Sequence, residues 1–390
     1  MTYRFHILGI PHTVSTVDYT LCAFTQKVVK LCRMLNGLGH QVIHYGHEDS
    51  IVYCDEHVTV TTRADLARSY GEKFDWRKDG LPLFKADDHA NRTFTCNAIA
   101  EVQRRKQPGD FLLCMWGWGH KGVADMHPDM LIVEPGIGYP GGHFAPFKVF
   151  ESYALLHAYL GLESVGSAQN NRWYDVVIPN YFDPSEFEYR AEKGDYFLFL
   201  GRIGVGKGTH IAIQIAEEID AKLLIAGPGT INQSMARTTR PLEEYVRCLG
   251  VADGPARRRL LGSAQAVLCP TTFVEPFCGV HVEAMMSGTP LITTDYGAFT
   301  EYNLHGNTGY RCRTFEQFTW ATRNIGEIEP RDCRYWAMRN FSLDRVAPMY
   351  DEFFWSVAHS AQAGGGWYQP RPERSELDWL TKDYPVPSAF

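Results

Sequence analysis

The chain has 390 residues, which is long enough for two domains of ordinary size. Apolar residues make up 45% and charged residues 21%, a globular composition that excludes a disordered protein. The formal net charge of −7 disfavours a protein that coats nucleic acid, although basic runs such as Arg257-Arg258-Arg259 keep local contacts open. Because no stretch approaches the ~18 apolar residues that span a bilayer, we expect a soluble chain with at most peripheral membrane contact.

The ten cysteines show neither a C-x-x-C pair nor a Cys/His ligand spacing, which argues against a metal site or a disulfide framework. The apolar run at residues 1–11 is too short for a signal peptide. Both features favour a reducing, cytoplasmic location. Most of the cysteines lie in apolar segments, where cysteine behaves as a small core residue: Cys22, Cys32, Cys114 and Cys269.

The first half of the chain alternates strands and helices. Residues 3–9 and 41–45 are predicted strands. The helix between them carries Phe24, Val28, Leu31 and Leu35 on one stripe. This order predicts an α/β fold that opens with a Rossmann-like half. Residues 55–83 are polar and irregular, and they give no assignment.

Loops that follow the later strands of this half carry candidate polar residues. A helix over 90–106 precedes a strand at 111–115, and the loop 116–120 should lie at the ligand-binding edge of the sheet. A strand at 130–133 delivers Glu134 to the same edge. His12, His120 and His143 fall in predicted loops, where each could orient or deprotonate a hydroxyl or serve the structure alone.

A glycine loop opens the second half. Residues 181–195 are predicted to form a linker, and a strand at 196–200 leads through the loop 201–209 into a helix. The loop nearly spells the phosphate-binding pattern G-x-x-x-x-G-K-[ST], but Gly208 stands where a magnesium-binding hydroxyl is required. Arg202 and Lys207 could instead neutralise phosphate oxygens, or be ordinary surface cations. The next strand, at 223–226, ends at Gly227.

Residues 264–295 are predicted to form strand, loop, helix and strand. Glu275 lies in the loop, and Glu283 lies on the helix eight positions later. Gly279 permits close approach at the helix start, where free N–H groups form an anion site. One acid could bind sugar hydroxyls, the amides could hold phosphate, and the other acid could bind ribose. This pattern suits a sugar joined to a nucleotide diphosphate.

The string Glu275-Pro276-Phe277-Cys278-Gly279, followed by Glu283-Ala284-Met285, resembles the E-x7-E signature of family 4 glycosyltransferases. These are retaining enzymes of the GT-B type. The resemblance is strongest over 176–313. It implies two Rossmann-like domains that face each other across a cleft. Their expected ranges are 1–185 for the acceptor domain, 186–340 for the donor domain, and 341–390 for a helix and tail that cross back onto the first.

The resemblance also implies a reaction, the transfer of a glycosyl unit from a UDP-sugar or GDP-sugar to an acceptor hydroxyl. Glu275, Arg202 and Lys207 would be catalytic. No Asp-x-Asp is present, so neither a metal nor a cofactor besides the donor is expected. On the acceptor side, the expected residues are His12 and His120, from their predicted loop positions, and Glu134, because many members place a histidine roughly where it stands. The expected donor-binding residues are Arg202, Lys207, Gly227, Glu275, Phe277, Cys278, Gly279, Val280 and Glu283.

Two further functions stay open at this point. One is a DNA-modifying glycosyltransferase that acts on hydroxylated bases, which the acidic composition disfavours. The other is a catalytically silent protein that binds sugar nucleotides. The residues specify neither the donor base and sugar nor the acceptor or the oligomeric state.

Overall fold

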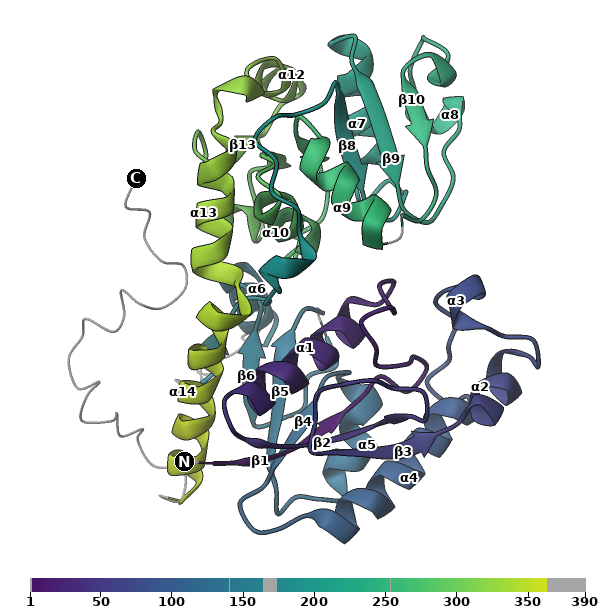
Figure 1. Cartoon of the computed structure of the whole chain (residues 1–390), viewed down its shortest axis with the longest axis vertical. Helices are drawn as coiled ribbons and strands as arrows, with labels where there is room; N and C mark the ends of the chain where they lie inside the picture. The colour runs from purple at the N-terminus through teal and green to yellow at the C-terminus, as the bar shows by residue number, and fades with distance from the viewer. Residues whose placement is uncertain (1, 140, 164–173, 253, 363–390) are drawn as a thin grey trace, which may run out of the picture. The chain divides into compact units, whose positions relative to one another are not determined.

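The computed structural model describes residues 2–139, 141–163, 174–252 and 254–362 (Figure 1). The chain divides into two compact units. Among the described residues, unit 1 takes those within Met1–Glu151, Ala158–Tyr181 and Val346–Lys382. Unit 2 takes those within Ser152–His157 and Phe182–Arg345. The units therefore exchange the chain more than once, and each has its own sheet.

Unit 1 is built on a parallel sheet of seven strands in the order β3-β2-β1-β4-β5-β6-β7 (Figure 1). The order reverses direction between β1 and β4, and such switch points are where open α/β sheets bind ligands. The strands are β1 (Arg4–Leu8), β2 (Gln41–His47), β3 (Glu56–Thr61), β4 (Phe111–Cys114), β5 (Leu131–Ile137), β6 (Phe147–Phe150) and β7 (Val176–Val177). The helices that lie wholly in unit 1 are α1 (Ala23–Gly37), α2 (Arg63–Tyr70), α3 (Trp76–Asp79), α4 (His89–Arg105) and α5 (Trp118–Asp125). Two further helices cross the boundary: α6 (Tyr153–Glu163) begins in unit 2, and most of α14 (Leu343–Gln362) belongs to unit 1.

The predicted apolar stripe of α1 faces the core. Val28, Leu31 and Leu35 are fully buried, as the spacing of four and three residues requires. At the end of the chain, α14 packs on the same unit. Phe354 lies with its ring 4.6 Å from that of Phe5, which belongs to β1. The helix expected within 341–390 is therefore present, whereas the part of that range from 363 onward lies outside the described residues.

Unit 2 repeats the pattern with six parallel strands in the order β10-β9-β8-β11-β12-β13. The strands are β8 (Tyr196–Leu200), β9 (Lys222–Ala226), β10 (Val246–Cys248), β11 (Val267–Cys269), β12 (Leu291–Thr294) and β13 (Gly309–Cys312). The α-helices are α7 (Thr209–Glu218), α8 (Gln233–Ala236), α9 (Gly254–Ser263), α10 (Gly279–Met286), α11 (Phe299–Tyr302), α12 (Phe315–Arg323) and α13 (Pro330–Phe341). Short 3₁₀ turns lie at η1 (Pro184–Glu186), η2 (Leu242–Glu244) and η3 (Ile325–Glu327). Two Rossmann-like units confirm the predicted α/β fold class.

Three local predictions differ from the structure. The unassigned stretch 55–83 contains β3, α2 and α3, and the reciprocal cap between Thr62 and Asp65 starts α2. The predicted loop 116–120 is partly helical, because α5 begins at Trp118. His120 therefore lies on a helix. Glu134 lies within β5 rather than in the loop after it, so its strand is longer than the apolar run alone indicated.

Candidate active site

The glycine loop after β8 turns at the carboxyl edge of the sheet of unit 2. Gly201 donates its amide to the Ala226 carbonyl at 2.9 Å, which ties the loop to the end of β9. A Cβ at Gly227 would lie 1.9 Å from the Gly201 carbonyl oxygen. Only glycine permits this approach. Gly201 and Gly227 therefore let the ends of β8 and β9 approach each other closely.

Gly208 stands where a nucleoside triphosphatase would carry the hydroxyl of Ser or Thr, and the backbone at this position requires glycine. It adopts left-handed φ of +72° as the N-cap of α7, and a Cβ there would lie 1.9 Å from the Pro270 carbonyl oxygen. The hydroxyl of Thr209 is buried and bonds to the Gly204 backbone instead. The loop therefore lacks a free hydroxyl at the place that magnesium would use.

Lys207 and Glu275 form an ion pair that joins this loop to the loop before α10. The Lys207 ammonium donates to both carboxylate oxygens, at 2.9 and 2.7 Å. Burial by itself would lower the pKa of Lys207, but the charges of Cys278 and Glu275 and the hydrogen bond outweigh it and raise that pKa. The Glu275 side chain is 7% exposed and that of Lys207 is 31% exposed. The lysine therefore stays charged and can still reach a ligand.

The other predicted cation, Arg202, is exposed. Within the part of the chain that the structure describes, its guanidinium makes no hydrogen bond or ion pair. It contrasts with Lys207, which already has a partner. A phosphate group would therefore meet one uncommitted cation and one that must first leave a carboxylate.

The start of α10 supplies backbone donors beside the ion pair. The first amides of any α-helix have no partner within the helix and attract anions. Cys278 is the N-cap, with φ of 66°, and Gly279 and Val280 open the helix. Phe277 is different, because its ring is 1% exposed and packs 5.2 Å from the ring of Tyr302. Its side chain therefore anchors the loop in the core and leaves only its backbone for a ligand.

Glu283, the predicted ribose acceptor, is held by an arginine. The Nε of Arg257, on α9, donates to the Glu283 carboxylate at 2.6 Å. A terminal nitrogen of the same guanidinium lies 2.5 Å from the same oxygen, Oε2. Among the described residues the other oxygen, Oε1, has no partner, so it is available to a hydroxyl. Arg257 thus fixes the orientation of Glu283, which gives the first arginine of the run 257–259 a structural role.

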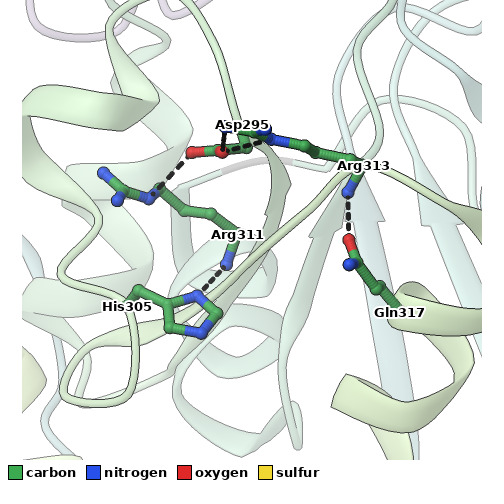
Figure 2. Close-up of a pocket in the computed structure, with 5 residues that line it drawn as sticks. All are labelled: Asp295, His305, Arg311, Arg313 and Gln317. Carbon is green, nitrogen blue, oxygen red and sulfur yellow. Dashed lines mark hydrogen bonds and ion pairs between the residues drawn. The ribbon is translucent and has the colours of Figure 1, made fainter.

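A pocket of about 320 Å³ lies nearby in unit 2, at the carboxyl ends of β12 and β13 (Figure 2). Asp295 lies between two arginines, 3.2 Å from Arg311 and 2.6 Å from Arg313. His305 accepts from the Arg311 amide, and Gln317 accepts from that of Arg313. None of the predicted donor-binding residues lines this pocket. Its charged groups satisfy one another, so it is a structural network beside the site.

The predicted acceptor-side residues of unit 1 are all buried. Glu134 accepts from the amides of Phe144 and Ala145, both at 2.9 Å, and from the Tyr139 hydroxyl at 3.2 Å. Burial raises the pKa of Glu134, although these hydrogen bonds oppose the shift. Its carboxylate is committed to holding the loop after β5. A direct role toward an acceptor stays a prediction that this geometry does not favour.

The two histidines differ in their partners. His120 donates from Nε2 to the Gly9 carbonyl at 2.9 Å, and so holds the loop after β1. Neither ring nitrogen of His12 has a hydrogen-bond partner among the described residues. The His12 ring stacks 3.9 Å from that of Phe84, and burial lowers its pKa to about 4. His12 is therefore a neutral imidazole with two unused nitrogens at the ligand-binding edge.

Comparison with known proteins assigns the second unit. Residues 194–325 match the family of glycosyl transferases group 1. This stretch is similar to the group 1 glycosyltransferases. Its match includes both the glycine loop and the whole of the stretch from Glu275 to Glu283, so the residues that carried the sequence resemblance lie within the family's shared region.

Two curated relatives and one solved structure illustrate what the chain is similar to. The glycogen synthase of Mycobacterium tuberculosis is 32% identical over 149 residues, which are 35% of this chain and 36% of that protein. The phosphatidyl-myo-inositol mannosyltransferase of the same organism is 31% identical over 147 residues, 35% and 39% of the two chains. The chain thus matches little more than a third of these relatives' length.

The solved structure is that of Anabaena HepE in complex with UDP-glucose. It has a TM-score of 0.62, with 13% identity, and covers 92% of this chain and 99% of that one. At this identity the likeness shows the fold alone, which is the GT-B type. The chain therefore has the predicted fold over the 92% of its length that this likeness covers.

Sequence reasoning missed two features of this region. The first is Arg257, whose role depends on a contact with Glu283 across 26 residues of sequence. The second is a cluster of Cys269, Cys278 and His281, which contradicts the expectation that no Cys/His ligand spacing is present. The Cys278-x-x-His281 spacing was the available signal. It went unnoticed because the third member lies on a different element.

Proposed function

We propose that this protein is a retaining glycosyltransferase that moves a sugar from a nucleotide diphosphate donor to an acceptor hydroxyl, without a metal ion in the chemical step. The observation that carries the proposal is the Lys207–Glu275 pair, with contacts of 2.9 and 2.7 Å, beside the first turn of α10. It brings a phosphate-binding cation, a sugar-binding acid and backbone donors together from separate loops.

The ion pair explains how the site could be kept ready in the absence of ligand. Without a donor, Lys207 and Glu275 neutralise each other. When a diphosphate arrives, Lys207 can turn toward it, and Glu275 is released to accept from sugar hydroxyls. Because the Glu275 side chain is only 7% exposed, the sugar hydroxyls must replace the ammonium as partners of its carboxylate when Lys207 turns away. A cation that stabilises the leaving diphosphate acts where charge develops in the transition state.

The remaining roles follow from position. Arg202, uncommitted and exposed, would neutralise the second charge of the diphosphate. The amides from Cys278 to Val280 would bind phosphate oxygens at the start of α10. Glu283, oriented by Arg257, would accept from ribose hydroxyls. Gly227, at the end of β9, would let the base approach the backbone.

The donor and the location are the finer parts of the proposal. HepE, which shares the fold, binds UDP-glucose, so we propose a UDP-sugar donor first and a GDP-sugar second. All ten cysteines are free, which supports a reducing, cytoplasmic location. Within the described ranges, no helix has the length and apolar character that crossing a bilayer would need.

The test is a panel of UDP- and GDP-sugars, each measured for thermal stabilisation of the chain and for slow hydrolysis without an acceptor. At least one donor should stabilise the chain and be hydrolysed, and Glu275→Gln should abolish the hydrolysis. Glu244→Gln is the matched control, since Glu244 is an exposed acid paired with Arg240 in the same unit. Stabilisation without turnover in any combination would instead indicate a silent sugar-nucleotide binding protein.

A further inference from the structure

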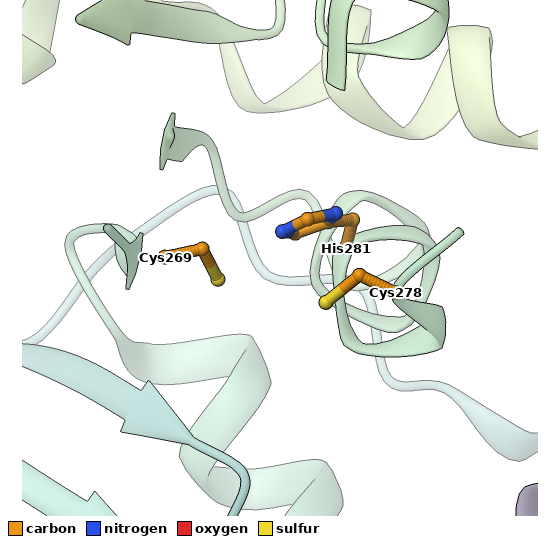
Figure 3. A group of neighbouring side chains, drawn as sticks. All are labelled: Cys269, Cys278 and His281. Carbon is orange, nitrogen blue, oxygen red and sulfur yellow. The ribbon is translucent and has the colours of Figure 1, made fainter. Parts of the chain in front are cut away.

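Three side chains with soft metal-binding atoms converge beside the proposed donor site (Figure 3). Cys269 ends β11, Cys278 caps α10, and His281 lies in the first turn of α10. Their ligand atoms all lie within 4.8 Å of one another. In Figure 3 both thiols and the imidazole ring point toward a common centre. Two sulfurs and one imidazole nitrogen are a donor set that favours Zn²⁺.

His281 carries an unused nitrogen in this cluster. The residue is 0% exposed, and its Nδ1 lies 3.1 Å from the Tyr302 hydroxyl. Its Nε2 has no hydrogen-bond partner among the described residues. A buried polar atom without a partner is costly, because it has lost its hydrogen bonds to water. A metal ion would satisfy Nε2, and the Tyr302 contact would fix the ring, as the hydrogen-bond partners of metal-bound histidines do.

Cys278 occupies a backbone conformation that disfavours a side chain. Its φ of 66° and ψ of 80° place it in the left-handed region. Only three non-glycine residues share positive φ in the described part of the chain, the others being Asp220 and Arg237. Glycine would avoid the steric penalty that a side chain meets at such a position. Strain of this kind is found where the side chain serves a function, which here is to present a thiol to Cys269 and His281.

We propose that Cys269, Cys278 and His281 bind a thiophilic cation, Zn²⁺ foremost, with a fourth position open to solvent or ligand. A tetrahedral Zn²⁺ with bonds of about 2.3 Å spaces its sulfurs about 3.8 Å apart, so the three groups need to close in only slightly. Each thiol releases its proton to solvent on binding. The two thiolates then balance the charge of the ion.

The local charges are compatible with this ion. Lys207 is near enough to both cysteines for their charges to affect its pKa, and Glu275 pairs with it. A neutral Zn²⁺-dithiolate centre adds no net charge beside that lysine. Cys278 is partly exposed, which gives the ion a path from solvent. The bound ion would tie the end of β11 to the first turn of α10, the same turn whose amides are proposed to bind phosphate.

The inference does not rest on the proposed function, because its readouts need no sugar transfer. The full chain is reduced, stripped of metal with a chelator, and titrated with Zn²⁺ and Cd²⁺. Native mass spectrometry should show one ion per chain, and Cd²⁺ should produce the ultraviolet charge-transfer absorption of thiolate bonds. Zn²⁺ should also raise the melting temperature, because it binds only the folded cluster.

The variants separate the site from unspecific thiol binding. Cys278→Gly relieves the strained backbone and so keeps the chain folded, yet it should weaken Cd²⁺ binding by at least about tenfold, as loss of a ligand does. His281→Asn should have a similar effect. Cys248→Ser, an exposed cysteine elsewhere in unit 2, should leave the affinity unchanged.

Two results would overturn the metal site. One is Cd²⁺ affinity that is the same in Cys278→Gly as in the parent. The other is a Cys269–Cys278 disulfide in the chain as isolated under anaerobic conditions, seen as a mass lower by two hydrogens. That outcome would make the pair a redox couple, with both electrons taken by an oxidant, and not a ligand set.

Discussion

Lys207 and Glu275 are each the other's partner in the ligand-free chain, so a substitution at one changes the environment of both. Removing Lys207 leaves a carboxylate that is 7% exposed without its cation. Removing the Glu275 carboxylate takes away one of the charges that raise the pKa of Lys207. Binding measurements with ligands that contain or lack the sugar can therefore separate what each residue does from what the pair does.

We expect Lys207→Ala and Arg202→Ala each to weaken binding of the bare nucleotide diphosphate. A charge-assisted contact is worth roughly 1.5–3 kcal/mol, which corresponds to about 10- to 150-fold in affinity. Transfer should slow by at least as much. The matched control is Lys222→Ala, which removes an exposed lysine paired with Asp195 in the same unit. Calorimetry that finds both variants as tight as the control would remove these cations from the site.

The two glutamates should separate in the same assay. Glu283→Gln should weaken binding of the bare nucleotide, because that ligand contains the ribose. Glu275→Gln should bind it nearly as the parent does, yet lose transfer, because its partner hydroxyls belong to the sugar. The defect of Glu275→Gln should appear in kcat more than in KM. Equal weakening in calorimetry, or the opposite order, would refute this division of roles.

Arg257 provides an internal check on Glu283. Arg257→Ala should reproduce part of the Glu283→Gln defect, since it removes the 2.6 Å contact that orients the carboxylate. The neighbouring Arg258→Ala serves as a control from the same run. If Arg257→Ala has no effect while Glu283→Gln does, the arginine is not a positioning residue.

Among the elements, we propose that the start of α10 and the glycine loop provide the positive charge that a divalent ion provides in other phosphate sites. Two cations and a helix N-terminus would supply this charge. We therefore expect transfer to need no added Mg²⁺ or Mn²⁺ and to survive chelator. Loss in EDTA that Mn²⁺ or Mg²⁺ restores would count against the site. Restoration by Zn²⁺ alone would point to the cysteine–histidine cluster instead.

The junction between β8 and α7 depends on Gly208. Gly208→Ala should lower the free energy of unfolding by more than about 2 kcal/mol, because φ is +72° and the new Cβ would meet the Pro270 carbonyl oxygen. Gly206→Ala is the control in the same loop, since its Cβ would make an ordinary contact of 3.5 Å with Phe273. Denaturant unfolding of both variants measures the difference. Equal stability would show that the loop relaxes around the substitution.

Elements with local signals were predicted well. The stretch that became β11, the loop and α10 has an apolar run, a proline stop, and Gly288 at the helix end, where φ is +74°. Residues 55–83 lack such periodicity, because β3 is an edge strand and α2 and α3 are short and mostly exposed. Only the Thr62 cap marked α2. Short, exposed elements bury too little apolar surface to leave a clear pattern.

Contacts between residues far apart in the chain could not be predicted from the sequence. Lys207 and Glu275 were both expected in the site, but nothing in a single sequence indicates that residues 68 positions apart form an ion pair. The same holds for Cys269 and His281. Conversely, Glu134 was expected in a loop because its charge broke an apolar run. The amides of Phe144 and Ala145 satisfy that charge inside the fold, so the strand continues through it.

For the whole molecule, the histidines of unit 1 link stability to pH. Burial lowers the pKa of His12 to about 4, and that of His44 and His120 to about 3. The unfolded chain binds these protons near pH 6.5, whereas the folded chain does not. Their stabilising contribution is therefore complete above about pH 6.5 and falls as the pH is lowered toward about 4. A shift of this size corresponds to on the order of 3 kcal/mol for one group.

We expect the melting temperature to drop between pH 7 and pH 5, and the drop to be smaller in His44→Gln, which has one fewer buried imidazole to protonate. His157→Gln, at an exposed histidine, should show the parent's slope. Differential scanning calorimetry across the pH range measures it. A His44→Gln profile parallel to that of the parent would mean that this imidazole is already protonated or solvated in the folded chain.

The close contact between Gly208 and Pro270 also limits how this loop can evolve. A single substitution, Gly208→Ser, would turn Gly-Lys-Gly into Gly-Lys-Ser and complete the signature of a nucleoside triphosphatase. In this fold the new side chain would collide with a backbone carbonyl, at 1.9 Å for the Cβ alone. Such a mutant would be removed by selection for folding before any change of chemistry could be tested. Proteins that differ by this one residue of the motif are thus separated by a structural barrier. The backbone at Pro270, which follows β11, would have to move before Gly208 could be replaced.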